Sequence, residues 1–518
     1  MELFSALTSF FFLLSSLYLF IHIHQTRPKK PNITNSTIII IKRYPILGHL
    51  LEFIKNRNRI LDWFTDILKQ NPKSTLVLKR PFNKPTVETA NPLNMEHLAK
   101  NNFDNYPKGH FMISLMGELL GGGIFNSDAE CWKVQRKAVS HEFSTKSLRN
   151  FVVKSVVVEI QTRLLPILEK ASETGQIIDL QDVLERFAFD NICQLAFDFD
   201  PGCLGTIHGA DSGGAGDKFM RDLAEAVEIS STRFMNFIPF LWRIKRFLNV
   251  GSEKRLKQLI LTIHKFADSI IKSRKESLSK EEKNTEGDLL SRFIGDDELN
   301  SPEFLRDIVT NMIIAGRDTT SSALSWFFWV LSSRQEIQHN ILKELELIRA
   351  RTDATNFNNS NTYSFDQIRD MQYMHAAISE SMRLYPPVPV NSRVCLNDDV
   401  WPDGTMVGKG TMVSFHPYAM GRMESIWGEN CLEFKPERWL VDGVFRPENP
   451  YRYPVFHGGP RMCLGKEMAY IQMKSIAASV LEKFEVGVLD EDTCPENLHV
   501  VTLRMKGGLP VRVSKRSV

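Results

Sequence analysis

The segment that most constrains the fold is the internal stretch IVTNMIIAGRDTTSSALSWFFWVL, from Ile308 to Leu331. Its length would suit a membrane span, but Arg317 and Asp318 lie at its centre. Each charge costs roughly 2.5–3.5 kcal/mol in the middle of an inserted helix. A long helix through the middle of a globular core is therefore the better prediction. The sequence SPE at 301–303 supplies a start signal, with a cap, a first-turn proline and an early acid.

The first 25 residues are predicted to form a transmembrane signal anchor. Leu3 to Ile23 carry no charge and approach the ~20 residues that cross a bilayer. A secretory signal peptide is the alternative, but the run is long, a basic n-region is missing and no A-x-A-like site follows. Three basic residues follow directly within the linker, residues 26–43, so the positive-inside rule keeps the rest of the chain in the cytosol.

Residues 44–518 are predicted to form one large domain, mainly α with small β-sheets. The 518-residue chain is 43% hydrophobic and 24% charged, as expected for a protein with a substantial core. A net charge of +3 without a basic stripe argues against nucleic-acid binding. The 7 cysteines are odd in number and form no CxxC pair, and a chain of this size needs no disulfide framework. No His/Cys cluster has ligand spacing, so a zinc site is not expected either. Helical periodicity dominates 128–480, and short strands are expected within 74–90, around 388–415 and after 485.

The central helix carries the motif AGRDTT, Ala315 to Thr320. The hydroxyl of Thr319 can bond back to the carbonyl of Ala315, and Gly316 lowers helix propensity, so we expect a local opening of the helix there. Asp318 beside Thr319 would then form an acid–alcohol pair suited to passing protons into a dry pocket. The alternative is a solvated Arg–Asp pair on an otherwise buried helix.

Two further motifs pair charged or aromatic side chains at helical spacing. In ESMR, Glu380 and Arg383 are three apart, as in an ordinary surface ion pair. The apolar flank and the arginine of PERW, Arg438, favour a buried Glu–Arg–Arg network instead. In CWKVQR, Trp132 and Arg136 lie one turn apart and could grip a carboxylate, although the same spacing is common on amphipathic helices.

The stretch FHGGPRMCLG, Phe456 to Gly465, places Cys463 behind two glycines, a proline and an arginine. Glycines let a backbone approach another group closely, and arginine suits carboxylates. The pattern indicates a loop that holds a large flat group carrying acids against one sulfur.

In this order the motifs resemble those of the cytochromes P450, the haem-thiolate monooxygenases, from about Tyr44 to the C-terminus. The cysteine loop matches at Phe456, Gly459, Arg461, Cys463 and Gly465. The resemblance implies the P450 fold, a haem b whose iron takes Cys463 as axial ligand, and O₂ as co-substrate. It implies that the haem propionates are held by Arg461, Trp132, Arg136 and Arg393.

The same resemblance implies roles for the other residues of the loop and of the central helix. Gly459 and Gly465 would let the loop lie against the porphyrin, and Phe456 would pack near the sulfur. Thr319 and Asp318 would deliver protons to oxygen. Electrons would come from NADPH through NADPH-cytochrome P450 reductase. The anchor would place the protein in the endoplasmic reticulum membrane, single-pass, with its catalytic domain in the cytosol.

Several phrases, among them WKVQRKAVSHEFSTKSLRNF and SESMRLYPPVPV, look closer to a plant branch that oxidises fatty acyl chains. This implies hydroxylation of the terminal (ω) carbon of a fatty acid or related oxylipin. A jasmonoyl-isoleucine conjugate and a sterol or steroid side chain remain alternatives. A hydroperoxide-rearranging haem enzyme is a remote one, because such relatives typically lack the threonine and alter the cysteine loop. A purely binding role is less expected still.

The lipophilic substrate is expected to meet apolar and basic side chains near the central helix. Ile314, Val388 and Val390 are candidates for a constriction, since β-branched side chains are stiff. His110 is a further candidate substrate contact. Candidates for a substrate carboxylate are Lys108, His110, Arg233 and Arg504, with a solvated surface role as the alternative for each. Ala315 stands where many animal ω-hydroxylases carry a glutamate that esterifies the haem, so no such bond is expected.

Overall fold

The computed structural model describes residues 44–516 except 45–46, 80–83, 141–142, 144–148, 150–154, 207–213, 236–239, 281–287, 297–298, 354–361 and 499–500. The predicted anchor (1–25) and linker (26–43) lie outside the described residues. Within the described ranges, no helix has both the length and the apolar character that a bilayer crossing requires.

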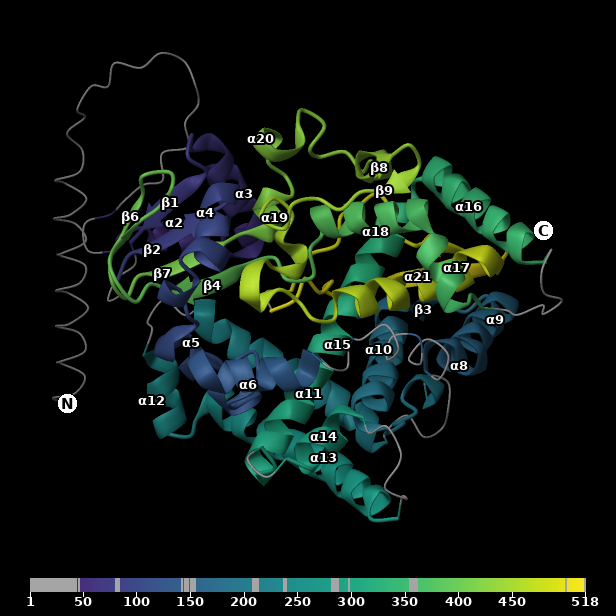
Figure 1. The fold of residues 1–518 in the computed structure, drawn as a ribbon, viewed down its shortest axis with the longest axis horizontal. Coiled ribbons are helices and arrows are strands. Elements are labelled where there is room, and N and C mark those ends of the chain that lie inside the picture. The colour runs from purple at the N-terminus through teal and green to yellow at the C-terminus, as the bar shows by residue number, and fades with distance from the viewer. Residues whose placement is uncertain are drawn as a thin grey trace, which may run out of the picture.

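Helices make up most of the described chain (Figure 1). Those of the first half are α2 (Leu50–Lys55), α3 (Ile60–Gln70), α4 (Pro92–Glu96), α5 (Gly109–Leu120), α6 (Ala129–Ser140), α8 (Val157–Glu159), α9 (Leu165–Thr174), α10 (Leu180–Phe197), α11 (Ala215–Met235), α12 (Leu241–Phe247) and α13 (Gly251–Leu278). Those of the second half are α14 (Leu289–Ile294), α15 (Pro302–Ser332), α16 (Gln335–Asp353), α17 (Phe365–Asp370), α18 (Gln372–Leu384), α19 (Pro417–Met420), α20 (Glu424–Trp427) and α21 (Lys466–Lys483).

The strands are short, and most of them lie in or at the edge of the three predicted regions; the strands at 178–179, 440–441 and 444–445 were not predicted. The larger sheet has the order β1-β2-β7-β4 and is antiparallel except for the β2–β7 pair. A second sheet has the order β10-β11-β3, and β5-β6 and β8-β9 form two-stranded ribbons. The bounds are β1 Thr75–Leu78, β2 Thr86–Thr89, β3 Ile178–Asp179, β4 Asn391–Val394, β5 Asp399–Val400, β6 Met406–Val407, β7 Met412–Phe415, β8 Leu440–Val441, β9 Val444–Phe445, β10 Phe484–Val488 and β11 Pro510–Lys515.

The central helix α15 confirms the prediction from the apolar stretch. It begins after Ser301, whose hydroxyl accepts a hydrogen bond from the backbone N–H of Phe304 at 3.3 Å. It packs against α10, α13, α18 and α21 and runs through the middle of the molecule in Figure 1. The expected opening at Ala315–Thr320 is not found, because α15 is α-helical throughout.

The structure gives Gly316 a packing role instead of a loosening one. A Cβ at Gly316 would lie 2.6 Å from Cγ1 of Ile192, so this position lets α10 approach α15 closely. Two hydrophobic clusters meet on α15: one contains Leu305 to Ile313, and the other contains Ala323 to Leu331. The AGRDTT motif therefore lies on α15 between the two cores.

Candidate active site

The cysteine loop runs from the one-turn helix Pro454–Phe456 to the start of α21 at Lys466. The backbone N–H of Cys463 donates to the carbonyl of Phe456 at 2.8 Å and closes the loop. All seven cysteines are free thiols, and the side chain of Cys463 is exposed. Desolvation by neighbouring protein groups raises the pKa of its thiol. The N–H of Gly465 and the charges of Arg136 and Lys466 act in the opposite direction and favour the thiolate.

Two glycines of the loop lie against neighbouring protein atoms, which is a second reason for glycine beside the one inferred from the sequence. Gly459 has φ of 65°, and a Cβ there would lie 1.9 Å from the carbonyl oxygen of Ala99. A Cβ at Gly458 would meet the ring of Tyr451 at 2.7 Å. At Gly465 a Cβ would make only ordinary contacts, and the sulfur of Cys463 would be 3.9 Å away.

A group of cationic side chains gathers beside the loop. Nη2 of Arg393, on β4, donates to Nε2 of His457 at 2.7 Å. Nη2 of Arg461 donates to Oδ1 of Asp128 at 2.6 Å, and its guanidinium lies 4.5 Å from the Trp132 ring. Burial, and then the charge of Arg461, lower the pKa of Arg393 to about 9. The pKa values of His457 and Lys108 fall well below their ordinary values for the same two reasons, burial and nearby cations.

The donor set of this cluster fits a dianionic group. Asp128 is the one carboxylate that we find acting on Lys108, Arg393 and Arg461 within the described ranges. Nε of Arg461 is buried without a hydrogen-bond partner. Buried cations without counter-charges are costly, so a ligand with two carboxylates would stabilise the cluster. The two propionates of a haem have this chemistry, and the residues fit that cofactor.

Trp132 and Arg136 lie on α6, as the CWKVQR spacing predicts for one helical turn. Trp132 is buried against Phe103, with ring centroids 5.9 Å apart. Burial lowers the pKa of Arg136, and the charge of Cys463 raises it. This places the guanidinium of Arg136 within electrostatic reach of the sulfur, from which it can favour the thiolate.

On α15, the hydroxyl of Thr319 donates to the carbonyl of Ala315 at 2.7 Å. Nε of Arg317 donates to Oδ1 of Asp318 at 2.5 Å, and both side chains are less than a tenth exposed. The pair is therefore buried, unlike the solvated alternative considered from the sequence. An acid and an alcohol stand next to each other on the helix, and the acid already has a cationic partner.

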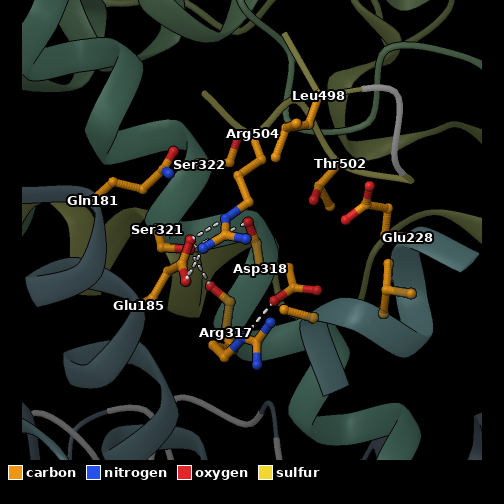
Figure 2. A pocket seen from close by; sticks show the side chains of 12 residues that line it. Gln181, Glu185, Glu228, Arg317, Asp318, Ser321, Ser322, Leu498, Thr502 and Arg504 are labelled. Atoms are coloured by element: carbon orange, nitrogen blue, oxygen red, sulfur yellow. Dashed lines mark hydrogen bonds and ion pairs between the residues drawn. The ribbon is translucent and has the colours of Figure 1, made fainter. Parts of the chain in front are cut away.

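Asp318 also lines a small cavity of about 30 Å³ between α10, α11, α15 and the C-terminal segment (Figure 2). The cavity has room for roughly two waters. Arg504 donates from Nε and Nη2 to both oxygens of Glu185, at 2.6 and 2.9 Å. Burial raises the pKa of Glu185 against the influence of Arg504 and Arg317. The cavity thus joins two acids, Asp318 and Glu185, across a polar space.

The structure brings Glu380, Arg383 and Arg438 together in the interior. Arg383 donates from Nε and Nη2 to the two oxygens of Glu380, at 2.7 and 2.8 Å, and both side chains are fully buried. Nε of Arg438 lies 3.3 Å from Oε1 of Glu380. Nε1 of Trp439 and the N–H of Lys435 each donate to Glu380 at 2.9 Å. Arg383 further donates to the carbonyls of Cys431 and Glu433, which fixes the meandering segment around residues 421–439.

The candidate substrate residues are placed in different environments. His110 is exposed at the start of α5, whereas Ile314, Val388 and Val390 are partly buried. Two of the candidates for a substrate carboxylate are already engaged. Arg233 is 3% exposed and bonded to Glu118 and Glu253, and Arg504 is bonded to Glu185.

Asp128 is a residue that the sequence interpretation missed. Its carboxylate accepts from the backbone N–H groups of Lys108 and Gly109, each at 2.9 Å, and from Arg461. It thereby connects the start of α5 to the cysteine loop. The only sequence signal is an acid directly before α6, which indicates a helix start and says nothing of a partner near the C-terminus.

The cysteine loop and the unbalanced cations beside it have the chemistry of a haem-thiolate site. The chain belongs to the cytochrome P450 family, whose family model matches residues 41–509. It is 48% identical over 474 residues to cytochrome P450 CYP94D108 of Paris polyphylla, covering 91% of each chain. It is 43% identical over 491 residues to cytochrome P450 94A1 of Vicia sativa (93% of this chain, 92% of the relative). It is also 42% identical over 481 residues to cytochrome P450 94B1 of Arabidopsis thaliana (91% of each).

The protein is therefore an oxidoreductase of the monooxygenase class. Membership of the family implies a haem iron, molecular oxygen, a reductase that supplies electrons, and a small lipophilic substrate.

Proposed function

We propose that this P450 hydroxylates the terminal carbon of a fatty acid or a related oxylipin, with electrons from NADPH through NADPH-cytochrome P450 reductase. The proposal includes haem b as cofactor, a domain spanning residues 44–518, and an N-terminal anchor that holds the enzyme on the cytosolic face of the endoplasmic reticulum. The resemblance of several sequence phrases to the plant acyl-chain branch supports this function.

When bound, the haem iron supplies the activation of molecular oxygen. The sulfur of Cys463 would ligate the iron, and Trp132, Arg136, Arg393 and Arg461 would hold the propionates. Gly459 and Gly465 would shape the loop, and Phe456 would pack beside it. The buried Glu380 network would hold the surrounding backbone.

Thr319 and Asp318 are proposed to supply protons at the oxygen-binding side of the site. The Thr319 hydroxyl has a fixed orientation, because it donates to the Ala315 carbonyl at 2.7 Å. The oxygen of the same hydroxyl can also accept a hydrogen bond from a donor such as water. Asp318 lies next to a cavity with room for water, which gives it access to proton donors. The ion pair with Arg317 must loosen before Asp318 can accept and pass on a proton.

The observation that supports oxidation at the terminal carbon is where the four candidate partners of a substrate carboxylate lie. Arg233 and Arg504 are bonded to glutamates, and Lys108 lies among other cations, so of the four only His110 is exposed. Burying a carboxylate without a free partner is costly. An acyl chain would therefore keep its acid end near the start of α5 and enter methyl first.

Selectivity for the terminal methyl must be geometric, because primary C–H bonds are the hardest of an alkyl chain to break. Val388, Val390 and Ile314 are the proposed constriction that lets the methyl alone reach the reactive centre, which is a positioning effect. Val388→Ala should shift product towards in-chain alcohols.

The test is a product analysis with full-length enzyme in membranes, reductase, NADPH and a C12–C18 fatty acid, read by mass spectrometry. A terminal alcohol should dominate, and the methyl ester of the same acid should give the same regiochemistry, because the acid end needs no buried cation. Predominantly in-chain alcohols from the wild type would refute the ω-hydroxylase proposal.

Parallel reactions test the alternatives. Jasmonoyl-isoleucine and a sterol would be preferred substrates if either of those alternatives held. Turnover of a fatty-acid hydroperoxide without NADPH or reductase would indicate a rearranging enzyme instead. Extended incubation shows whether the alcohol is carried on to the acid.

A further inference from the structure

Arg233 lies at a junction of four helices and is almost fully buried, at 3% exposure. From α11 it donates through Nη1 to the carbonyl of Leu115 in α5 at 2.7 Å. Nη2 bonds to Glu118, also in α5, and to Glu253 of α13, while Nε donates to Glu253 at 3.2 Å. One side chain therefore connects α5 to both α11 and α13.

The fourth helix joins through aromatic and charged contacts. The guanidinium of Arg233 lies 4.5 Å from the ring centroid of Trp242 in α12. Arg246, one turn later in α12, lies 3.2 Å from Glu118. Two arginines thus face two glutamates, and the charges of the junction balance.

Helix α5 is fixed at both ends to the parts of the active site. At its start the N–H groups of Lys108 and Gly109 donate to Asp128, which binds Arg461 of the cysteine loop. At its end the carbonyl of Leu120 accepts from Asn311 of α15 at 2.9 Å, one helical turn before Ala315. Helix α5 therefore spans the site from the cysteine loop to the AGRDTT motif.

Within the described part of the chain, we find no equivalent bond from the middle of α5 to the active site, and Arg233 of α11 holds this part of the helix. Met116 and Leu119 of α5 belong to the same hydrophobic cluster as Ile313, and Ile314 and Leu464 pack against that cluster. A shift of α5 relative to α15 would therefore change the space beside Ile314 and beside Leu464, the residue next to Cys463.

We propose that Arg233 is a positioning residue for regioselectivity. By tying Leu115 and Glu118 to α11 and α13, it fixes the position of α5 relative to the cysteine loop and α15. This position determines which carbon of the substrate is oxidised. The inference deepens the proposed function and rests on it. Arg233 acts through α5 and needs no contact with the substrate.

Two substitutions test this at different strengths. Arg233→Lys keeps one charge but cannot serve Leu115, Glu118 and Glu253 together. Glu118→Gln leaves the Arg233–Glu253 pair in place and weakens only the link to α5. Because Glu118 is 24% exposed, this second variant will fold even if the first does not.

The matched control is Arg255→Gln. Arg255 and Glu225 join the same two helices, α11 and α13, through two bonds at 2.7 and 2.5 Å. The two side chains of that pair are about half exposed, and among the described residues we find no hydrogen bond from either of them to α5. A general loosening of α11 against α13 would appear in this control as well.

The first readout is the ratio of in-chain to terminal alcohols from a C12–C18 acid, with the reduced CO spectrum as a check on the haem site. The ratio should rise by about threefold to tenfold in Arg233→Lys and Glu118→Gln, less than the ~100-fold that a 1 Å misplacement can cost. Arg255→Gln should keep the wild-type ratio.

The second readout is amide hydrogen exchange of residues 109–120 in the holoenzyme, which should accelerate in the two test variants and not in the control. A wild-type product ratio in Glu118→Gln together with faster exchange would overturn the proposal, as would wild-type values of both. If the wild type makes no terminal alcohol, the proposed function fails. In that case Arg233 is tested by the ratio of the actual wild-type product to its positional isomers, which should change in the two test variants and not in the control.

Discussion

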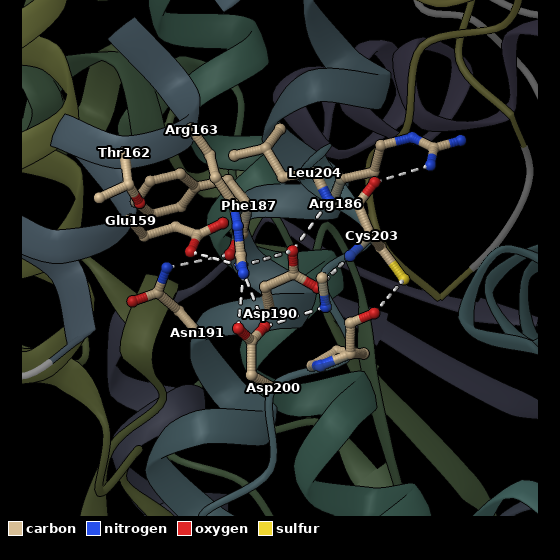
Figure 3. Close-up of polar contacts among 12 residues, drawn as sticks. Glu159, Thr162, Arg163, Arg186, Phe187, Asp190, Asn191, Asp200, Cys203 and Leu204 are labelled. Carbon is tan, nitrogen blue, oxygen red and sulfur yellow. Dashed lines mark hydrogen bonds and ion pairs between the residues drawn. The ribbon is translucent and has the colours of Figure 1, made fainter. Parts of the chain in front are cut away.

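Replacing Glu159 by glutamine should change how stability depends on pH. Glu159 and Arg163 lie on the helical segment Val157–Leu164, facing Asp190 of α10 and Asp200 of the following loop (Figure 3). Arg163 serves all three acids: Nη1 lies 2.9 Å from Glu159, 2.9 Å from Asp200 and 3.6 Å from Asp190. Oε1 of Glu159 is buried without a partner. Three carboxylates share one cation, so a proton on one of them relieves the excess charge.

Burial, and then the charge of Asp190, raise the pKa of Glu159 from 4.5 to about 8. Between these two values the folded protein binds a proton that the unfolded chain releases, so stability is lost as the pH rises. The slope is about 1.4 kcal/mol per pH unit, or roughly 2–3 kcal/mol between pH 6 and 8. Burial raises the pKa of Asp190 to about 6, so its own titration falls mainly below this window.

The assay is the thermal unfolding midpoint of the holoenzyme by circular dichroism at pH 6, 7 and 8. Subtracting the unfolding midpoint of the wild type from that of Glu159→Gln at each pH removes the contribution of the other titrating groups, and the result is the midpoint difference. It should move in favour of the variant by roughly 2–3 °C from pH 6 to 8, given an unfolding entropy of ~2 cal/mol/K per residue. Glu225→Gln is the control, since the bond to Arg255 lowers the pKa of that exposed acid. A difference that stays constant with pH would refute the reasoning.

Three other substitutions test the proposed site. Cys463→Ala should remove the thiolate-type spectrum of the reduced CO complex, and an unchanged spectrum would exclude Cys463 as ligand. Glu380→Ala strands the buried Arg383 at a cost of about 3–5 kcal/mol, so little holoprotein should form; normal haem content per chain would contradict this. Thr319→Ala should bind substrate but yield less product per NADPH oxidised, because proton supply fails. An unchanged ratio would remove Thr319 from the mechanism.

Much of the fold and the composition of the site could be predicted from short-range patterns. The cap at Ser301 and the apolar run defined α15 because a helix start and a buried face are both local signals. The burial of Glu380 and Arg383 followed from the apolar flank of their helix. Trp132 and Arg136 lie one turn apart for the same local reason.

The remaining features depend on pairings between distant segments, which no local pattern encodes. Asp128 binds Arg461, more than 300 positions later, and nothing in either motif names the other. Arg233 resembled a free cation in the sequence because Glu118 and Glu253 come close only after four helices pack. Gly316 was expected to open the helix, whereas its neighbour is Ile192 of α10, and the contact of Gly459 with Ala99 could not be foreseen from the loop motif.

The interleaving of the sheets determines when this protein can mature during its synthesis. β2 near the N-terminus pairs with β7, and β3 pairs with β11 at the far end of the chain. More than 300 residues separate β2 from β7, and more than 300 separate β3 from β11, and these must leave the ribosome before either pair can form. A nascent chain elongates at about 5–20 residues per second, so these strand edges stay unpaired for many seconds. Cys463, the proposed haem ligand, follows β7 in the chain, so haem would bind only once the larger sheet can close. Shorter nascent chains would expose unpaired strand edges, which are prone to aggregate.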